Sequence, residues 1–145
     1  MQGENLRIIL DTSFILKIRK SEKALELLKD ESKGASDIGI SILSLYELEV
    51  GSNYLWLKRR DYSERAWLKE ILRWLTIYRI NERSIKRAAM IKARALARGE
   101  SYPDMDLLIA TTISGPAKLL SCDEDHFKMA KDLEEFDLEV VHIDD

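Results

Sequence analysis

The sequence is poor in the residues that cross-link or interrupt a chain. Its one cysteine, Cys122, has no partner for a disulfide bond within the chain, which excludes the disulfide-rich scaffolds of secreted proteins. Two prolines and six glycines are present, and neither a linker rich in these residues nor an internal repeat divides the sequence. We therefore expect a single domain over residues 1–145, long enough to bury a core without disulfide or metal support.

Long apolar runs are also missing. No stretch approaches the roughly 18 to 20 apolar residues that cross a bilayer. The opening residues, MQGENLRIIL, lack the basic flank and apolar centre of a signal peptide. The sequence thus predicts a cytoplasmic protein with no membrane partner.

A large excess of positive charge is absent as well. The 26 aspartates and glutamates outnumber the 23 lysines and arginines, and the formal net charge is −3. The chain therefore lacks the overall basicity of many nucleic-acid-binding proteins, although a local basic cluster such as Lys58, Arg59 and Arg60 is compatible with RNA.

The sequence does contain a regular alternation of short apolar runs and amphipathic segments. Runs typical of buried strands are residues 6–10, 37–41, 76–80, 117–122 and 138–143. Helical spacing of apolar residues occupies 13–31, 42–57, 63–75, 84–98, 103–114 and 123–133. Strands so short and apolar indicate a parallel sheet covered by helices on both faces. The predicted fold is α/β, a three-layer α/β/α domain with a short parallel sheet of about five strands.

Three residues predict helix ends. Ser63 is suited to be the N-cap of the segment 63–75. Gly99 follows the Ala-rich segment 84–98 in the position where glycine commonly ends a helix. Pro103 suits the first turn of the helix that follows.

Four carboxylates stand where a charge is costly. Asp11 and Asp123 follow apolar strand-like runs and are expected beyond the carboxyl ends of strands, where α/β sheets gather functional groups. Glu47 and Asp106 have apolar or small neighbours at helical spacing. They are therefore expected on a helix face that packs against the rest of the protein. In one cleft these acids would raise one another's pKa values unless a cation neutralised them. Carboxylate oxygens favour Mg²⁺ or Mn²⁺ over Zn²⁺.

Most of these acids have a structural alternative. Asp11 and Asp123 are also good helix N-caps, and Asp104 and Asp106 complement the dipole of a first helical turn. The acids come in near pairs, 104 with 106 and 123 with Asp125. Which member of each pair faces the cleft stays open.

Four motifs, in this order, resemble those of the PIN-domain ribonucleases, particularly the VapC toxins of toxin–antitoxin pairs. They are IILDTSFIL, SILSLYELEVG, PDMDLLIATTI and LLSCDEDHF, and together they cover essentially the whole chain. The resemblance implies a PIN-like fold and metal-dependent hydrolysis of RNA phosphodiester bonds with Mg²⁺ or Mn²⁺. The implied catalytic and metal-binding residues are Asp11, Glu47, Asp106 and Asp123.

The resemblance also implies roles for individual residues. Asp11, Asp106 and Asp123 would be the principal ligands, and Glu47 a further ligand or the group that orients and deprotonates the attacking water. Additional members of the site would be Asp104, Asp125, Thr12, Ser13 and Ser121, the hydroxyl groups acting by hydrogen bonds around the ligands.

RNA must be drawn to an acidic site by positive charge around it. Arg87, Arg94 and Arg98 fall near one stripe of the segment 84–98, with residues 58–60 as a second source. The alternative is a solvated helix face. We take both groups as candidate phosphate contacts.

Four aromatic residues, Tyr54, Trp56, Trp67 and Trp74, are expected to pack in the core. Exposed, they would instead serve partners that the VapC resemblance implies, a second copy in a homodimer or an antitoxin protein.

There are two alternative classes of function. One also places an Asp at the end of an early strand, and the other keeps the PIN-like fold but has no catalytic activity. A Mg²⁺-dependent phosphoryl-transfer domain of the haloacid-dehalogenase type needs a second Asp where this chain has Ser13. A PIN-like RNA- or protein-binding module without catalysis is disfavoured by the presence of all four acids. His126, His142 and Cys122 form no triad or zinc pattern, and we expect ordinary interior or surface residues there.

Overall fold

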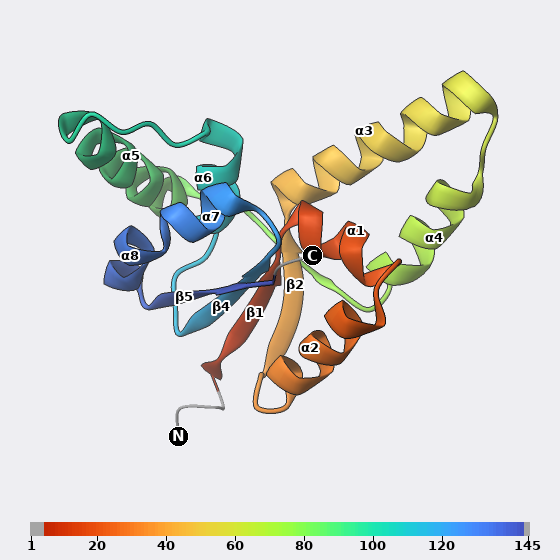
Figure 1. Cartoon of the computed structure of the whole chain (residues 1–145), viewed down its shortest axis with the longest axis horizontal. Helices are drawn as coiled ribbons and strands as arrows, with labels where there is room; N and C mark the ends of the chain where they lie inside the picture. Colours follow the sequence, from red (N-terminus) through yellow and green to blue (C-terminus); the bar gives the residue numbers. More distant parts are fainter. Residues whose placement is uncertain (1–4, 144–145) are drawn as a thin grey trace.

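The computed structural model describes residues 5–143 (Figure 1). Five parallel strands form one sheet in the order β3-β2-β1-β4-β5. The strands are β1 (Arg7–Leu10), β2 (Asp37–Ser41), β3 (Thr76–Tyr78), β4 (Ala117–Ser121) and β5 (Leu138–His142). The helices are α1 (Thr12–Ile18), α2 (Glu22–Ser32), α3 (Ile42–Arg59), α4 (Ser63–Leu72), α5 (Glu82–Ala97), α6 (Asp104–Ala110), α7 (Glu124–Lys128), α8 (Ala130–Leu133) and the 3-10 helix η2 (Glu134–Phe136).

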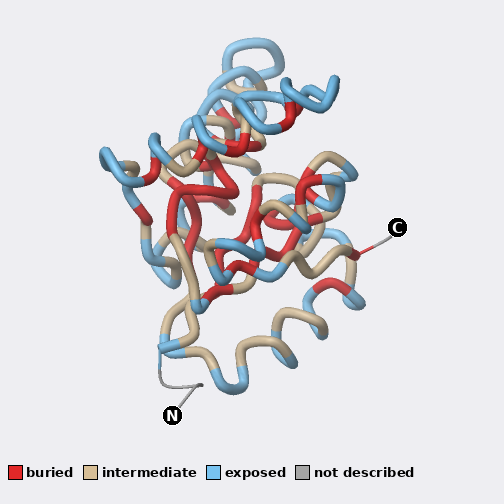
Figure 2. Tube along the Cα trace, turned by 90° about the vertical axis from the view of Figure 1, so that its left-hand side faces the viewer, coloured by how far each residue is buried: buried red, intermediate tan, exposed pale blue. Residues whose placement is uncertain are grey.

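Helices cover both faces of this sheet, and the core is therefore divided in two. Successive side chains of β1 point to opposite faces: Ile8 and Leu10 pack against residues of α1 to α4, whereas Ile9 packs against residues of α5, α6 and α8. Figure 2 shows the buried residues along the centre of the trace and the exposed residues on the outer turns. The predicted three-layer α/β/α fold with a five-stranded parallel sheet is confirmed.

The order of the strands places two of their ends side by side. From β1 the chain proceeds outward through β2 to β3, and then returns to the other side of β1 for β4 and β5. Leu10 is aligned with Leu120 of β4, and the main-chain N–H of Asp11 donates to the carbonyl oxygen of Leu120 at 3.2 Å. Such a switch in strand order leaves a crevice at the carboxyl ends of the strands.

One predicted helix is broken. The segment 13–31 forms α1 and α2, with a break at residues 19–21. The hydroxyl of Ser21 accepts a hydrogen bond from the N–H of Ala24 at 3.2 Å and caps α2. The prediction of one continuous segment was wrong because the apolar spacing continues across a break that a single capping serine creates.

Two predicted helix starts also differ. Ser63 is the first residue of α4 and not its cap; its N–H donates to Oδ1 of Asp61 at 2.9 Å. Helix α5 begins at Glu82, two residues earlier than predicted, because Asn81 and Ser84 form a reciprocal capping box.

Residues around α6 show a further difference. Pro103 stands at the N-cap position of α6, just before the predicted first turn. Gly99 follows α5 with a φ of +80°, the left-handed conformation that favours glycine, as predicted.

The edge strand β3 pairs closely with β2 only because residue 39 is a glycine. A Cβ at Gly39 would lie 2.2 Å from the carbonyl oxygen of Thr76 and 2.8 Å from Cε2 of Tyr78. The space lets Tyr78 reach back to Asp37, whose Oδ2 accepts a hydrogen bond from the phenol at 2.9 Å. Burial, followed by the hydrogen bond and charge of Asp37, raises the pKa of Tyr78.

Candidate metal centre

Asp11 stands at the centre of the site. It follows β1 directly and is 2% exposed. Its Oδ1 accepts the N–H of Phe14 at 2.8 Å and so caps α1. Its Oδ2 accepts the hydroxyl of Ser121 at 2.6 Å. Asp11 therefore has both a cap role and a position at the end of β4, because the residue that caps α1 also contacts Ser121.

Two serine hydroxyls join the ends of β1 and β4. The Ser13 hydroxyl lies 2.8 and 2.9 Å from the two carboxylate oxygens of Asp11 and accepts the N–H of Cys122 at 3.1 Å. The Ser121 hydroxyl accepts the N–H of Asp123 at 2.9 Å. These bonds fix the Asp11 carboxylate relative to the loop that carries Asp123.

A buried histidine completes the surroundings of Asp11. His126 of α7 is 1% exposed, and its Nδ1 lies 2.9 Å from Oδ2 of Asp11 and 2.9 Å from the Ser121 hydroxyl. Its Nε2 lies 2.8 Å from the carbonyl oxygen of Asp106. A carbonyl oxygen can only accept, so Nε2 carries a proton. Burial acts to lower the pKa of His126, but the hydrogen bond and charge of Asp11 outweigh it and the pKa is raised.

From the sequence, His126 is expected to be an ordinary interior or surface residue. The structure places it in the interior, but in contact with Asp11 and the main chain of Asp106. The available signal is its spacing: His126 follows Asp123 by three positions at the start of a helix, and residues three apart share a face.

Three carboxylates converge beside this histidine. Asp106 of α6, Asp123 and Asp125 are half-buried, and each offers an oxygen within 4.8 Å of the others. Burial, then the charge of Asp123, and then those of Asp125 and Glu47 raise the pKa of Asp106 to about 6, against the opposing charge of His126. Asp123 also caps α7, its Oδ1 accepting the N–H of Asp125 at 2.8 Å.

The two near pairs of acids, Asp104 with Asp106 and Asp123 with Asp125, differ in how many members join the cluster. Asp104 is exposed and pairs with Nζ of Lys92 at 3.0 Å, and it is not among the groups of converging ligand atoms in residues 5–143. Asp106 is in such a group, and so are both Asp123 and Asp125. Direct coordination by these residues stays a prediction.

Glu47 approaches the site from the other side. It lies in α3, and its Oε1 accepts a hydrogen bond from the Thr12 hydroxyl at the start of α1. Its charge contributes to the raised pKa of Asp106. The two elements that flank the strand ends, α1 and α3, thus hold Glu47 facing α6.

The residues fit a hard divalent cation. The converging oxygens belong to Asp106, Asp123 and Asp125, and three carboxylate ligands without thiolates suit Mg²⁺ or Mn²⁺. A second group of ligand atoms joins Asp11, Asp123 and His126. The oxygens of Asp11 already accept hydrogen bonds from Ser13, Phe14 and Ser121, and Oδ2 contacts Nδ1 of His126, which suits Asp11 to orienting the cluster.

The candidate RNA contacts lie outside this cluster. Arg87 is half-buried, and its Nη2 donates to the carbonyl oxygens of Thr111 and Thr112 at 2.9 and 3.3 Å. Arg94 pairs with Glu135, and Arg98 pairs with Asp132 and Glu100, both at 3.0 Å. Their binding of RNA stays a prediction.

The basic cluster Lys58–Arg60 is exposed at the far end of α3. Arg59 follows Glu47 by twelve positions, a rise of about 18 Å along a helix. The cluster is therefore remote from the carboxylates, and contact with RNA there would require a long substrate.

The prediction of core packing was wrong for two of the aromatic residues. Trp74 is 78% and Tyr54 59% exposed, because Trp74 lies in the turn after α4 and Tyr54 on the outer face of α3. Trp56 and Trp67 are half-buried, and Trp67 packs against the core below the guanidinium of Arg19, 5.1 Å from its ring.

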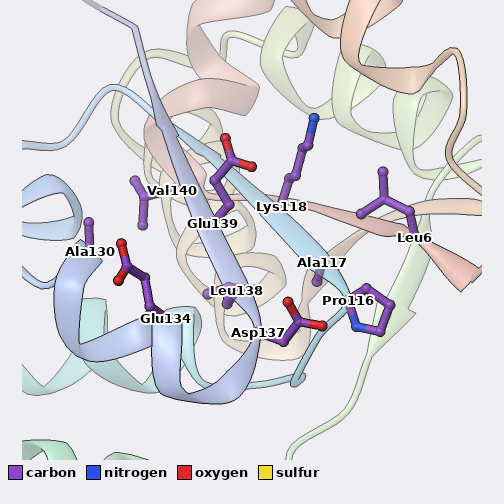
Figure 3. A pocket seen from close by; sticks show the side chains of 10 residues that line it. All are labelled: Leu6, Pro116, Ala117, Lys118, Ala130, Glu134, Asp137, Leu138, Glu139 and Val140. Atoms are coloured by element: carbon purple, nitrogen blue, oxygen red, sulfur yellow. The ribbon is translucent and has the colours of Figure 1, made fainter. Parts of the chain in front are cut away.

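A separate hollow of about 380 Å³ lies at the opposite edge of the sheet (Figure 3). Its lining includes Leu6, Ala117 and Leu138 at the amino ends of three strands. Lys118, on the same hollow, pairs with Glu31 at 3.1 Å. None of the candidate site residues lines it.

The comparisons with solved structures agree with the fold. Among solved structures, VapBC2 from Rickettsia felis bound to a DNA fragment from their promoter gives a TM-score of 0.78 at 19% identity, covering 95% of this chain and 99% of that chain. VapBC-1 from nontypeable Haemophilus influenzae gives 0.71 at 16% identity, covering 94% and 97%. VapBC-5 from Mycobacterium tuberculosis, of the VapBC family of toxin–antitoxin systems, gives 0.67 at 18% identity, covering 94% and 98%.

At these identities the likeness shows the fold. No curated protein sequence gives a significant match. Within residues 5–143, no helix has the length and apolar character needed to span a membrane. The PIN domain family matches residues 8–132, and the chain belongs to this family.

Proposed function

We propose that this protein is a metal-dependent endoribonuclease of the VapC type. The observation that carries the proposal is the convergence of Asp106, Asp123 and Asp125 beside the carboxyl ends of β1 and β4, with Asp11 and Asp123 in a second, adjoining group. Carboxylates in such an arrangement repel one another, and a divalent cation relieves the repulsion.

The proposed ligands of Mg²⁺ or Mn²⁺ are Asp106 and Asp123, with Asp125 as a third and Asp11 as a direct or water-mediated fourth. When bound, the cation polarises a phosphodiester and lowers the pKa of an attacking water. Asp11 keeps the loop after β4 in place through Ser121. Asp104 has no part in this set, because Lys92 holds it outside.

Glu47 is the proposed general base. Thr12 donates to Oε1, which leaves Oε2 able to accept a proton from water. The half-buried surroundings that raise the pKa of Asp106 also strengthen hydrogen bonds within the site.

For phosphate contacts we keep Arg94, Arg98 and the cluster Lys58–Arg60, all of which are exposed. Arg87 is better explained as a cap of the carbonyl groups after α6. Charge reversal at Arg94 is expected to weaken RNA binding and to reduce its dependence on salt.

The outer face of α3 supports a protein partner. An exposed apolar stripe runs along it at spacings of four, four and three residues: Tyr46, Val50, Tyr54 and Leu57, 50 to 70% exposed. Such a stripe is typical of a helix that packs against another protein. We propose that it contacts a second copy of the chain or an antitoxin protein.

The experiment compares purified wild type with Asp106→Asn and Asp104→Asn on mixed RNAs in Mg²⁺, Mn²⁺ or chelator. We expect cleavage by wild type and Asp104→Asn in metal, and a loss of at least about 100-fold in Asp106→Asn. Cleavage that ignores both chelator and Asp106→Asn would contradict the proposal. Tight RNA binding without cleavage by any form would favour a binding module instead.

A further inference from the structure

One side chain links three elements that the proposed metal site needs in register. Asp11 follows β1, Asp106 lies in α6, and His126 lies in α7. The imidazole forms a hydrogen bond with Asp11 through Nδ1 at 2.9 Å and another with the main-chain carbonyl oxygen of Asp106 through Nε2 at 2.8 Å. A rigid ring therefore spans the gap between the residue after β1 and the helix that carries Asp106.

The same residue is tied to the third acid. Asp123 caps α7 through its side chain, and His126 follows it by three positions in this helix of five residues. The Ser121 hydroxyl contacts both Nδ1 of His126 and the N–H of Asp123, each at 2.9 Å. Movement of the imidazole would therefore disturb the positions of both Asp106 and Asp123.

A purely space-filling role fits these contacts poorly. Burial of an imidazole is costly unless both nitrogens have partners, and an apolar side chain would fill the same volume without that cost. Here the partners are the Asp11 carboxylate and the carbonyl group of a proposed ligand. The hydrogen bonds fix orientation, which packing alone does not.

We propose that His126 is a positioning residue that sets the separation of Asp11 and Asp106, and with it the geometry of the carboxylates that receive the cation. This inference rests on the proposed metal-dependent function. His126 acts through its neighbours and takes no part as ligand or base.

The test uses three substitutions of His126 and measures Mn²⁺ affinity by calorimetry, together with kcat and KM for RNA. His126→Leu removes both hydrogen bonds. His126→Asn keeps an amide nitrogen near the position of Nδ1, and His126→Gln keeps one near Nε2. We expect His126→Leu to bind Mn²⁺ about 10- to 100-fold more weakly and to lose kcat with little change in KM. Each amide variant should lie between His126→Leu and wild type.

Leu133→Ala in α8 is the matched control, because Leu133 is buried in the neighbouring helix, in the core cluster that includes Ile91 and Leu138. We expect it to lower stability and leave Mn²⁺ affinity unchanged. A similar loss of affinity in Leu133→Ala would overturn the proposal, as would wild-type affinity in His126→Leu or, should that variant not fold, in both amide variants.

The two proposals fail in different ways. Wild type that binds Mn²⁺ but cleaves no RNA, with weakened binding in His126→Leu, would refute the nuclease and support the positioning role. Wild type that cleaves RNA, with unaltered Mn²⁺ binding in His126→Leu, would refute the positioning role alone. Wild type without Mn²⁺ affinity would refute both.

Discussion

The hydroxyl group of Thr12 donates a hydrogen bond to Oε1 of Glu47, which lies 35 positions further along the chain. Thr12 is the first residue of α1 and Glu47 lies in α3, so this bond joins two helices on one side of the crevice. It engages Oε1 of Glu47 and leaves Oε2 free of this bond.

Replacement of Thr12 by Val is therefore expected to lower kcat for RNA cleavage about 10-fold, the equivalent of one hydrogen bond of about 1.4 kcal/mol. Val has nearly the shape of Thr, so the thermal midpoint should change little. Thr12→Ser keeps the hydroxyl and should retain most of the activity in the same assay. Equal kcat values for Thr12→Val and wild type would show that Glu47 needs no such support.

The raised pKa of Asp106 predicts a pH dependence. Because the folded-state pKa is about 6 and the ordinary value is 3.8, the metal-free fold holds this proton more tightly than the unfolded chain does. The stability that the protonated Asp106 carboxyl group contributes is therefore lost as the pH rises from about 4 to about 6. Asp106→Asn should become the more stable of the two proteins over that range, as measured by thermal unfolding.

The same shift predicts how a cation acts. Mn²⁺ should raise the thermal midpoint of wild type more at pH 7 than at pH 5, since ligands must be deprotonated, and should leave Asp106→Asn nearly unchanged. A difference between the two proteins that stays constant from pH 4 to pH 7 in chelator would contradict the assigned environment of Asp106.

Asp11→Asn separates the capping role from the site. Asn is as good an N-cap as Asp, but the amide nitrogen that replaces Oδ2 cannot accept the hydrogen bond from the Ser121 hydroxyl. We expect a loss of about 1 to 3 kcal/mol in the free energy of unfolding and loss of RNA cleavage. Urea unfolding and the cleavage assay measure the two effects.

Ser21→Ala is the comparison for that variant, because it removes the cap of α2, a helix that carries none of the candidate site acids. It should cost about 1 kcal/mol with activity intact. If Asp11→Asn unfolded at the same urea concentration as wild type, the hydrogen bonds to Asp11 would have no net stabilising effect.

Two glycines predict opposite effects of the same substitution. Gly39→Ala would force Cβ to within 2.2 Å of the carbonyl oxygen of Thr76, so β3 must separate from β2 and stability should fall by several kcal/mol, on the order of 3. Gly51→Ala, within α3 and with nothing within 4 Å, should raise stability by about 0.5 to 1 kcal/mol. Chemical denaturation of the two variants, side by side, measures this.

A destabilised Gly51→Ala would indicate that α3 is strained at this point. A stable variant that had lost self-association would place a close partner against Gly51.

Much of the fold was accessible from the sequence, because strands buried on both faces read as continuous apolar runs. The runs at 37–41 and 117–122 illustrate this, matching β2 and β4 to within a residue. The break between α1 and α2 was not accessible, since one serine creates it within unbroken apolar spacing.

The candidate site could be predicted where chain position carried the information. Asp11 and Asp123 could be found because they follow strands. The spacing of His126 from Asp123 places it on the same helical face, but its contacts with Asp11 and Asp106, 115 and 20 positions away, form only in the folded chain. The exposure of Trp74 likewise depends on a turn after α4 that its helical spacing does not reveal.

Helix α3 begins at the sheet but its second half runs away from it, with α4 alongside (Figure 1). A projecting pair of helices has few neighbours that protect its main-chain hydrogen bonds. Local unfolding should therefore break these bonds more often at the far end than in the strands. Deuterium from solvent should therefore enter residues 53–66 well before it enters β1, and a protein that grips this end would slow that uptake.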